Sequence, residues 1–285
     1  MSSQSKTAQQ PVSGKNADKV FKGVAYACGI LILVVLAAVA LFLLFRAWPL
    51  IGGDQKANSA TIGNFTGGKA SSFWGYVGPL LFGTVLISAL ALLISFFVSV
   101  GIALFISHYA PKKLATALSY VVDLLAAIPS VIYGLLGILI LNPLMYKMEL
   151  AVFKGSSTHQ YTGGANLISA VLVLALMILP TVINISESAL RAVPGHLKSA
   201  SLALGATKIQ TIFQVILPAA KSGIITAVVL GVGRAIGEAM AITLVSGSSV
   251  NMPLPFNSVR FLTTAIVAEM GYASGLHREA LIATG

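Results

Sequence analysis

Charged residues are scarce in this chain, and their scarcity excludes most soluble folds. Only 9% of the 285 residues are charged, whereas a soluble globular domain carries about 25%. Hydrophobic residues make up 56% of the chain and its mean hydropathy is +0.90, so disorder over most of its length is excluded as well. The composition predicts an all-α protein that crosses a membrane several times.

Cysteine and the common catalytic motifs are also missing or nearly so. Cys28 is the single cysteine and lies in an apolar run, so no disulfide can form within the chain. No G-x-x-x-x-G-K-[ST] phosphate loop, nucleophile elbow, H-E-x-x-H or paired-cysteine motif occurs. The four histidines lack the spacing of metal ligands. The chain is therefore not expected to be an enzyme, to hydrolyse ATP or to hold a metal or cofactor of its own.

Basic residues outnumber acidic ones, with 18 Lys and Arg against 8 Asp and Glu. In a soluble chain this excess would suggest a nucleic-acid partner, but here it fits cytoplasmic loops that follow the positive-inside rule. No nucleic-acid partner is expected. Lysines and arginines gather in the N-terminal tail and after the second and fourth apolar runs. If the spans alternate, these segments share one side, which predicts a cytoplasmic N-terminus.

Five apolar runs are long enough to cross the roughly 30 Å hydrocarbon core of a bilayer. They are Val24–Phe45, Tyr76–Ser107, Leu114–Leu141, Leu167–Ser186 and Pro218–Val245. The last stretch, Gly275–Gly285, predicts the beginning of a sixth span that is cut off. The pattern divides the chain into a disordered cytoplasmic tail at 1–23, a first spanning helix with an exterior loop at 24–74, and a helical bundle at 75–285 with a cytoplasmic loop at 194–217.

The 194–217 loop and the proline that follows it predict two short helices around a glycine. Gly205 can adopt the positive φ that ends the first helix, near Leu204. Thr207 and Gln210 have the spacing of a capping box, which predicts the start of the second helix. Such a helix–glycine–helix element can present a knob to a soluble partner, and the alternative is an amphipathic hairpin on the membrane surface.

The fifth run contains two charged residues, Arg234 and Glu238, which share one face if the helix is continuous. A lone charge at mid-bilayer costs about 2.5–3.5 kcal/mol, whereas an exposed i,i+4 pair returns only about 0.2–0.5 kcal/mol. This face is therefore expected to lie against protein or a water-filled path. There Arg234 could bind an oxyanion, and Glu238 could pair with Arg234 when the site is empty. The alternative is a structural ion pair that fixes helix packing.

The third run also contains polar residues and a proline. Pro129 removes a backbone donor, so Ser130 and the freed carbonyl could line a path, and a packing kink is an equal alternative. Asp123 is expected to play a structural role by pairing with Arg191 or Lys221. A second i,i+4 pair, formed by Glu187 and Arg191, predicts a solvated ion pair at a helix end.

The cytoplasmic loop resembles the signature loop of bacterial ABC-importer permeases, which reads E-A-A-x-x-x-G-x₉-I-x-L-P. The glycine and the final L-P match, whereas Ser199 stands where glutamate is usual, so a salt bridge from that position is not expected. The resemblance implies a type I ABC-importer permease fold and a loop on which an ATPase docks. The residues that would couple to the ATPase are Ser199, Ala200, Gly205, Ala206, Leu217 and Pro218.

The fifth run, G-V-G-R-A-I-G-E-A-M-A, resembles the fifth helix of phosphate-specific permeases of the PstC type. The D-L-L-A-A-I-P-S-V-I-Y-G stretch from Asp123 and the S-G-L-H stretch from Ser274 are similar to the same family, and the likeness covers roughly residues 76–285. The resemblance implies that Arg234 and Glu238 take part in phosphate passage. Permeases for sulfate, molybdate or phosphonate, and an ion-coupled secondary carrier, are the alternatives.

The resemblance also implies a complex in the bacterial inner membrane. Its other members would be a PstA-type permease as heterodimer partner, two PstB-type ATP-binding subunits and a PstS-type phosphate-binding protein. ATP and Mg²⁺ would bind on the ATPase subunits. Together with the lipid bilayer, these are the partners expected for the chain.

Overall fold

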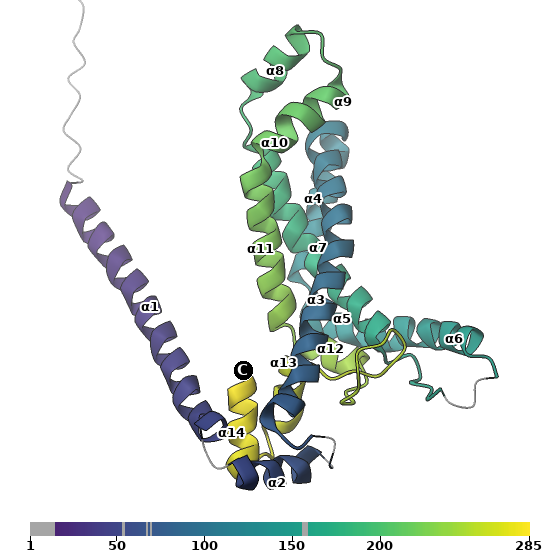
Figure 1. Cartoon of the computed structure of the whole chain (residues 1–285). Helices are drawn as coiled ribbons and strands as arrows, with labels where there is room; N and C mark the ends of the chain where they lie inside the picture. The colour runs from purple at the N-terminus through teal and green to yellow at the C-terminus, as the bar shows by residue number, and fades with distance from the viewer. Residues whose placement is uncertain (1–14, 53–54, 67, 69, 156–158) are drawn as a thin grey trace, which may run out of the picture.

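The computed structural model describes residues 15–52, 55–66, 68, 70–155 and 159–285, and this part of the chain is helical (Figure 1). Within these residues the one sheet-like feature is a single bridge between Gly247 and Val259. Four helices are long and apolar enough to cross a membrane, and a fifth span results if one bent pair of helices counts as one. The prediction of an all-α membrane bundle is confirmed.

The core of the bundle consists of α3 (Phe73–Leu104), α7 (Leu167–Arg191) and α11 (Lys221–Gly237), which pack against one another. Helix α7 lies at the centre, because 61% of its most apolar window is buried. A glycine allows α11 to approach it closely: a Cβ added at Gly223 would lie 2.3 Å from the Cβ of Ala189. A π-helical turn, η1 (Phe105–Tyr109), extends α3.

The third apolar run is not one helix, contrary to the prediction. Helix α4 (Lys112–Ala127) ends before Pro129, and α5 (Ser130–Leu136) begins directly after it. Ile128 is extended, with ψ 127°, because a proline disfavours helical backbone in the residue before it. The helix then runs on through η2 (Gly137–Leu141) and α6 (Asn142–Val152), so that the candidate span is Ser130–Val152.

The fifth run is broken as well. It begins in α10 (Leu217–Ala219), and the helical pair formed by Lys208–Ala219 and Lys221–Gly237 bends by 65°. Helix α11 then ends at Gly237, and α12 (Met240–Val245) follows after two residues. Helix α12 packs against α5, where a Cβ added at Gly134 would lie 3.0 Å from the Cα of Ala241.

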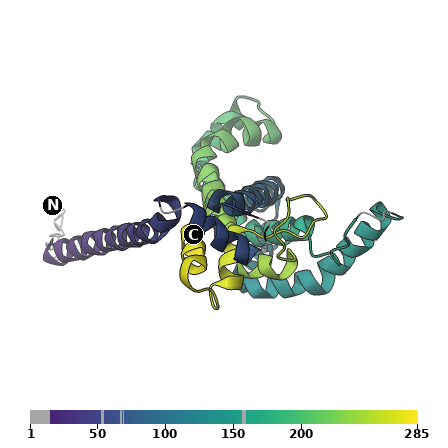
Figure 2. The same cartoon turned by 60° about the horizontal axis from the view of Figure 1, so that its bottom comes forward.

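Helix α1 (Lys15–Gly52) stands apart from the bundle (Figure 1). It starts nine residues before the predicted Val24, so the described part of the expected tail, 15–23, is helical; residues 1–14 lie outside the described part. Its far end contacts α14 (Gly275–Thr284) through Arg46 and Glu279, 3.8 Å apart. Figure 2 shows α1 and α6 projecting from opposite sides of the bundle.

Short helices occupy both ends of the molecule. The expected exterior loop contains α2 (Gln55–Thr66), which lies beside α14 and α13 (Leu262–Glu269) at one end. At the other end, α8 (Gly195–Ala203), α9 (Lys208–Thr211) and the π-helical η3 (Ile212–Ile216) form the loop between α7 and α11 (Figure 1). The sequence predicts this helical loop correctly, and the helical start of the last segment as well.

Candidate translocation site

Arg234 lies in the last turn of α11, about 13 residues and hence roughly 20 Å along the helix axis from its beginning. Its side chain is partly buried, and Nη1 donates to the hydroxyl of Thr181 on α7 at 3.5 Å. Its Nε is buried and has no hydrogen-bond partner among the described residues. A guanidinium inside the bundle thus retains unused hydrogen-bonding capacity.

Glu238 does not pair with Arg234, so the predicted i,i+4 ion pair is wrong. Helix α11 ends at Gly237, and Glu238 has extended backbone with φ −74° and ψ 129°. Its carboxylate accepts from the backbone N–H of Ala241 at 3.0 Å, and its carbonyl accepts from the hydroxyl of Thr263 at 2.7 Å. Both contacts stabilise the break between α11 and α12, so Glu238 is not part of the helix that carries Arg234.

A polar stripe on α7 leads from Arg234 toward the α8 end of the bundle. Thr181, Asn184 and Ser188 are three and four residues apart, so they share one face of this helix. The side-chain amide of Asn184 donates to Asp123 of α4 at 2.9 Å. Asp123 is therefore hydrogen-bonded to a neutral amide, and the predicted ion pair with Arg191 or Lys221 is wrong.

The stripe ends in a cavity of about 360 Å³ between α4 and α7, here called the α4–α7 cavity. Its lining consists of Ser119, Asp123, Asn184, Glu187, Ser188 and Arg191. The Glu187–Arg191 pair forms at 2.8 Å as predicted, but it is not solvated at both ends, because the Glu187 side chain is only 11% exposed. Ser119 also donates to this carboxylate at 3.3 Å.

Pro129 marks the break between α4 and α5, and the carbonyl that the proline leaves free finds hydrogen-bond donors nearby. The carbonyl of Leu125, which the proline cannot bond, accepts instead from the hydroxyl of Tyr133 at 2.8 Å and from the N–H of Ile128 at 3.3 Å. Ser130 begins α5. The freed carbonyl therefore serves the bend itself, in line with the packing alternative.

The loop between α7 and α11 is built as the sequence predicts. Gly205 has φ +85°, and the N–H of Ala206 closes the turn on the carbonyl of Ser201 at 3.2 Å. The capping box is present: the N–H of Gln210 donates to the Thr207 hydroxyl at 3.3 Å, and the N–H of Thr207 donates to Gln210 Oε1 at 2.8 Å.

The sequence predicts a knob at the tip of this loop, but it does not identify the apolar side chain that lies there. Leu204, directly before the turn glycine, is 90% exposed. Ser199 and Ala200 are also exposed, as are Gly205 and Pro218, whereas Ala206 and Leu217 are partly buried. Leu204 is the most exposed of several apolar side chains on this loop, and together they form a surface that a protein partner can cover. The signal was its position next to a glycine that needs positive φ.

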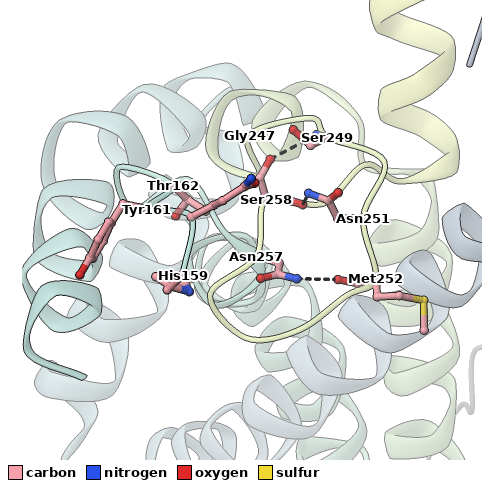
Figure 3. Close-up of a pocket in the computed structure, with 10 residues that line it drawn as sticks. His159, Tyr161, Thr162, Gly247, Ser249, Asn251, Met252, Asn257 and Ser258 are labelled. Carbon is pink, nitrogen blue, oxygen red and sulfur yellow. Dashed lines mark hydrogen bonds between the residues drawn. The ribbon is translucent and has the colours of Figure 1, made fainter. Parts of the chain in front are cut away.

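A polar pocket of about 590 Å³ lies at the opposite end, between the 159–162 and 247–258 segments (Figure 3). Its walls carry hydroxyl and amide groups, and the longer segment curves around it, held by hydrogen bonds between Ser249 and Ser258 and between Asn257 and Met252 (Figure 3). Beside it the fully buried carboxylate of Glu149 accepts from His159 at 2.8 Å.

Comparisons with known proteins place this chain in a family. The model of the family described as "Binding-protein-dependent transport system inner membrane component" matches residues 99–276. The phosphate transport system permease protein PstC 2 of Mycobacterium tuberculosis is 36% identical over 244 residues, which cover 82% of this chain and 75% of that protein.

Two further relatives extend the likeness over almost the whole chain. The phosphate transport system permease protein PstC of Haemophilus influenzae is 32% identical over 278 residues, covering 94% of this chain and 87% of that protein. The PstC protein of Mycobacterium leprae is 34% identical over 285 residues, covering 95% and 88%. The matched segment contains the Arg234 site, the α4–α7 cavity and the loop between α7 and α11.

Proposed function

Because the chain belongs to the binding-protein-dependent inner membrane component family and to its PstC-type phosphate permeases, we propose that it carries inorganic phosphate through the inner membrane as one subunit of an ATP-driven importer. The relatives' names favour phosphate over sulfate, molybdate or phosphonate as the substrate. The family also disfavours an ion-coupled secondary carrier, since the matched proteins are components of binding-protein-dependent systems.

The observation that carries the proposal is the incompletely satisfied guanidinium of Arg234 inside the bundle. A charged side chain at mid-bilayer costs about 2.5–3.5 kcal/mol. A typical hydrogen bond returns about 0.5–1.5 kcal/mol, and the one to Thr181 is long, at 3.5 Å. The protein therefore keeps a cation whose cost its resting contacts do not offset. A passing phosphate supplies the missing charge and the oxygen acceptors that suit a guanidinium.

The pathway proposed here runs from Arg234 along the α7 stripe to the α4–α7 cavity. Glu238 belongs to it through the helix break that it stabilises rather than through an ion pair with Arg234. Discontinuous helices near the midplane are typical of substrate sites in transporters. Alternating access would follow from a rocking motion that opens this path to one side at a time.

The energy for this motion would come from partner subunits. The α8–α9 loop, with Leu204 at its tip and Ser199, Ala200 and Gly205 exposed around it, is the proposed docking surface for an ATP-binding subunit that holds ATP and Mg²⁺. This orientation puts the N-terminus and the loop in the cytoplasm. The pocket in Figure 3 would then face outward, toward the phosphate-binding protein.

The complete importer would contain this chain, a related PstA-type permease, two PstB-type ATPases and a PstS-type binding protein. One permease chain supplies one docking loop, and two ATPases need two. The exposed apolar surface of α1 leaves room for contact with lipid or with the second permease.

The test is phosphate uptake by the reconstituted complex in liposomes. Arg234→Gln removes the charge and keeps much of the side chain's length, and it should abolish uptake while the complex still assembles. The matched control is Arg46→Gln, because Arg46 lies on α1 beside Glu279, far from the core; its uptake should stay near wild type. Normal uptake by the Arg234→Gln complex would contradict the assignment.

A further inference from the structure

Asp123 is a carboxylate on α4 that pairs with no cation among the described residues. It lies 11 residues, or roughly 16 Å of helix, beyond Lys112 at the beginning of α4. The side chain is exposed in the isolated chain, as are its neighbours Tyr120 and Leu124. No cationic group forms a salt bridge with it among the residues that the structure describes, and its hydrogen bond comes from the neutral amide of Asn184.

The cation that lines the same cavity already has an acidic partner. Arg191, in the same α4–α7 cavity, pairs with Glu187 at 2.8 Å, and Ser119 also donates to Glu187. Asp123 therefore lines the cavity without a salt-bridge partner among the described residues. The cavity borders the spanning helix α7, and an ionisable side chain beside a spanning helix is a candidate for a transport pathway.

The α4–α7 cavity is also the next polar site along α7 after Arg234. Thr181 contacts Arg234 and lies three residues, or about one helical turn, from Asn184, which holds Asp123. An anion that leaves the guanidinium along this stripe must pass the carboxylate of Asp123. For a bare anion this passage is repulsive, so the residue has to offer something specific to the cargo.

What an ionised aspartate offers is hydrogen-bond acceptance and nothing else. Inorganic phosphate at neutral pH retains at least one hydroxyl proton, whereas sulfate retains none. We propose that Asp123 accepts a hydrogen bond from the hydroxyl of the passing phosphate and thereby admits protonated oxyanions while repelling those without a proton. Asn184 is the positioning residue that holds one oxygen of Asp123 and leaves the other for the cargo. This inference rests on the proposed phosphate transport.

The binding protein selects among anions by itself, so the competing anion must reach the permease without passing through it. The competing anion is therefore placed on the side of the membrane where the ATP-binding subunits act. ATP is trapped inside proteoliposomes that contain the whole complex, and the binding protein with labelled phosphate is added outside. Only complexes with their ATPases inside are then driven. Arsenate, which carries a proton, or selenate, which is similar in size and carries none, is trapped with the ATP, and initial uptake rates are compared.

In the wild-type complex arsenate should inhibit uptake at concentrations roughly 10- to 100-fold lower than selenate, the range expected for one hydrogen bond to a charged group. Asp123→Asn should bring the two inhibition constants together, weakening arsenate and strengthening selenate. The matched control is Glu279→Gln, a carboxylate on α14 beside Arg46, which should keep the wild-type ratio.

The outcomes separate the two proposals. Absence of phosphate uptake by the wild-type complex would refute the proposed function. Phosphate uptake with equal inhibition by arsenate and selenate in the wild type would overturn the role of Asp123 without any variant. A ratio that is unchanged in Asp123→Asn would overturn it as well, because a merely structural aspartate would affect both anions alike.

Discussion

The turn at Gly205 allows a test of whether the backbone shape of the loop, rather than the size of its side chains, couples ATP hydrolysis to transport. Gly205 has φ +85°, and a Cβ added there would meet nothing within 4 Å. Any cost of a substitution is therefore conformational. A side chain in left-handed backbone costs about 1–2 kcal/mol, which shifts the population of the native turn by roughly 5- to 30-fold. Asparagine tolerates this region better than alanine, and a β-branched residue tolerates it least.

These costs predict an order that side-chain size alone would not produce. The number of phosphates imported per ATP hydrolysed should fall from glycine to Gly205→Asn, then to Gly205→Ala, and should be lowest for Gly205→Val. The assay is uptake and ATP hydrolysis measured on the same reconstituted complex. Gly195→Ala is the matched control, because Gly195 is also exposed at the start of a loop helix but has no positive φ. If alanine couples better than asparagine, steric fit at the docking surface governs coupling and the reasoning is refuted.

Two further predictions concern packing and docking. Gly223→Val should lower the stability of the complex by about 1–3 kcal/mol through overpacking, because its Cβ would lie 2.3 Å from that of Ala189. The thermal unfolding midpoint of this variant should fall, whereas Gly101→Ala, with open space around the glycine, should leave the midpoint unchanged. Equal midpoints for the two variants would contradict the close approach of α11 to α7. Leu204→Ser should weaken co-purification of the ATP-binding subunit several-fold, whereas Leu202→Ser on the less exposed side of α8 should weaken it less; equal retention in both would count against the knob.

The parts of this fold that the sequence predicts are those set by local chemistry. Run length identifies the apolar helices because a bilayer demands about 20 apolar residues. The loop between α7 and α11 follows from one glycine at positive φ and a Thr207–Gln210 capping box, and both appear as expected. These signals act within a few residues, so one sequence is enough to find them.

The side-chain partners between neighbouring helices are not predictable in the same way. Asp123 was assigned to a cation, but it bonds to Asn184 because the register of α4 against α7 puts a neutral amide opposite it. That register depends on which faces of the two helices pack together. Periodicity shows that each helix has a polar position, but it does not show how far one helix has slid along the other.

The error over Arg234 and Glu238 has a different origin, and it bears on how the site forms. The pattern was right in its residues and wrong in assuming one continuous helix. What ends α11 at Gly237 is tertiary: the Thr263 hydroxyl bonds to the Glu238 carbonyl, and α12 packs against α5. The Pro129 break turns α5 toward the same place, where Gly134 lets α12 approach within contact distance. Two helix breaks thus lie close to Arg234, whose buried Nε has no hydrogen-bond partner among the described residues. In an unbroken helix Glu238 would lie one turn from Arg234, within reach of a salt bridge; because α11 ends at Gly237, the two side chains form no such pair.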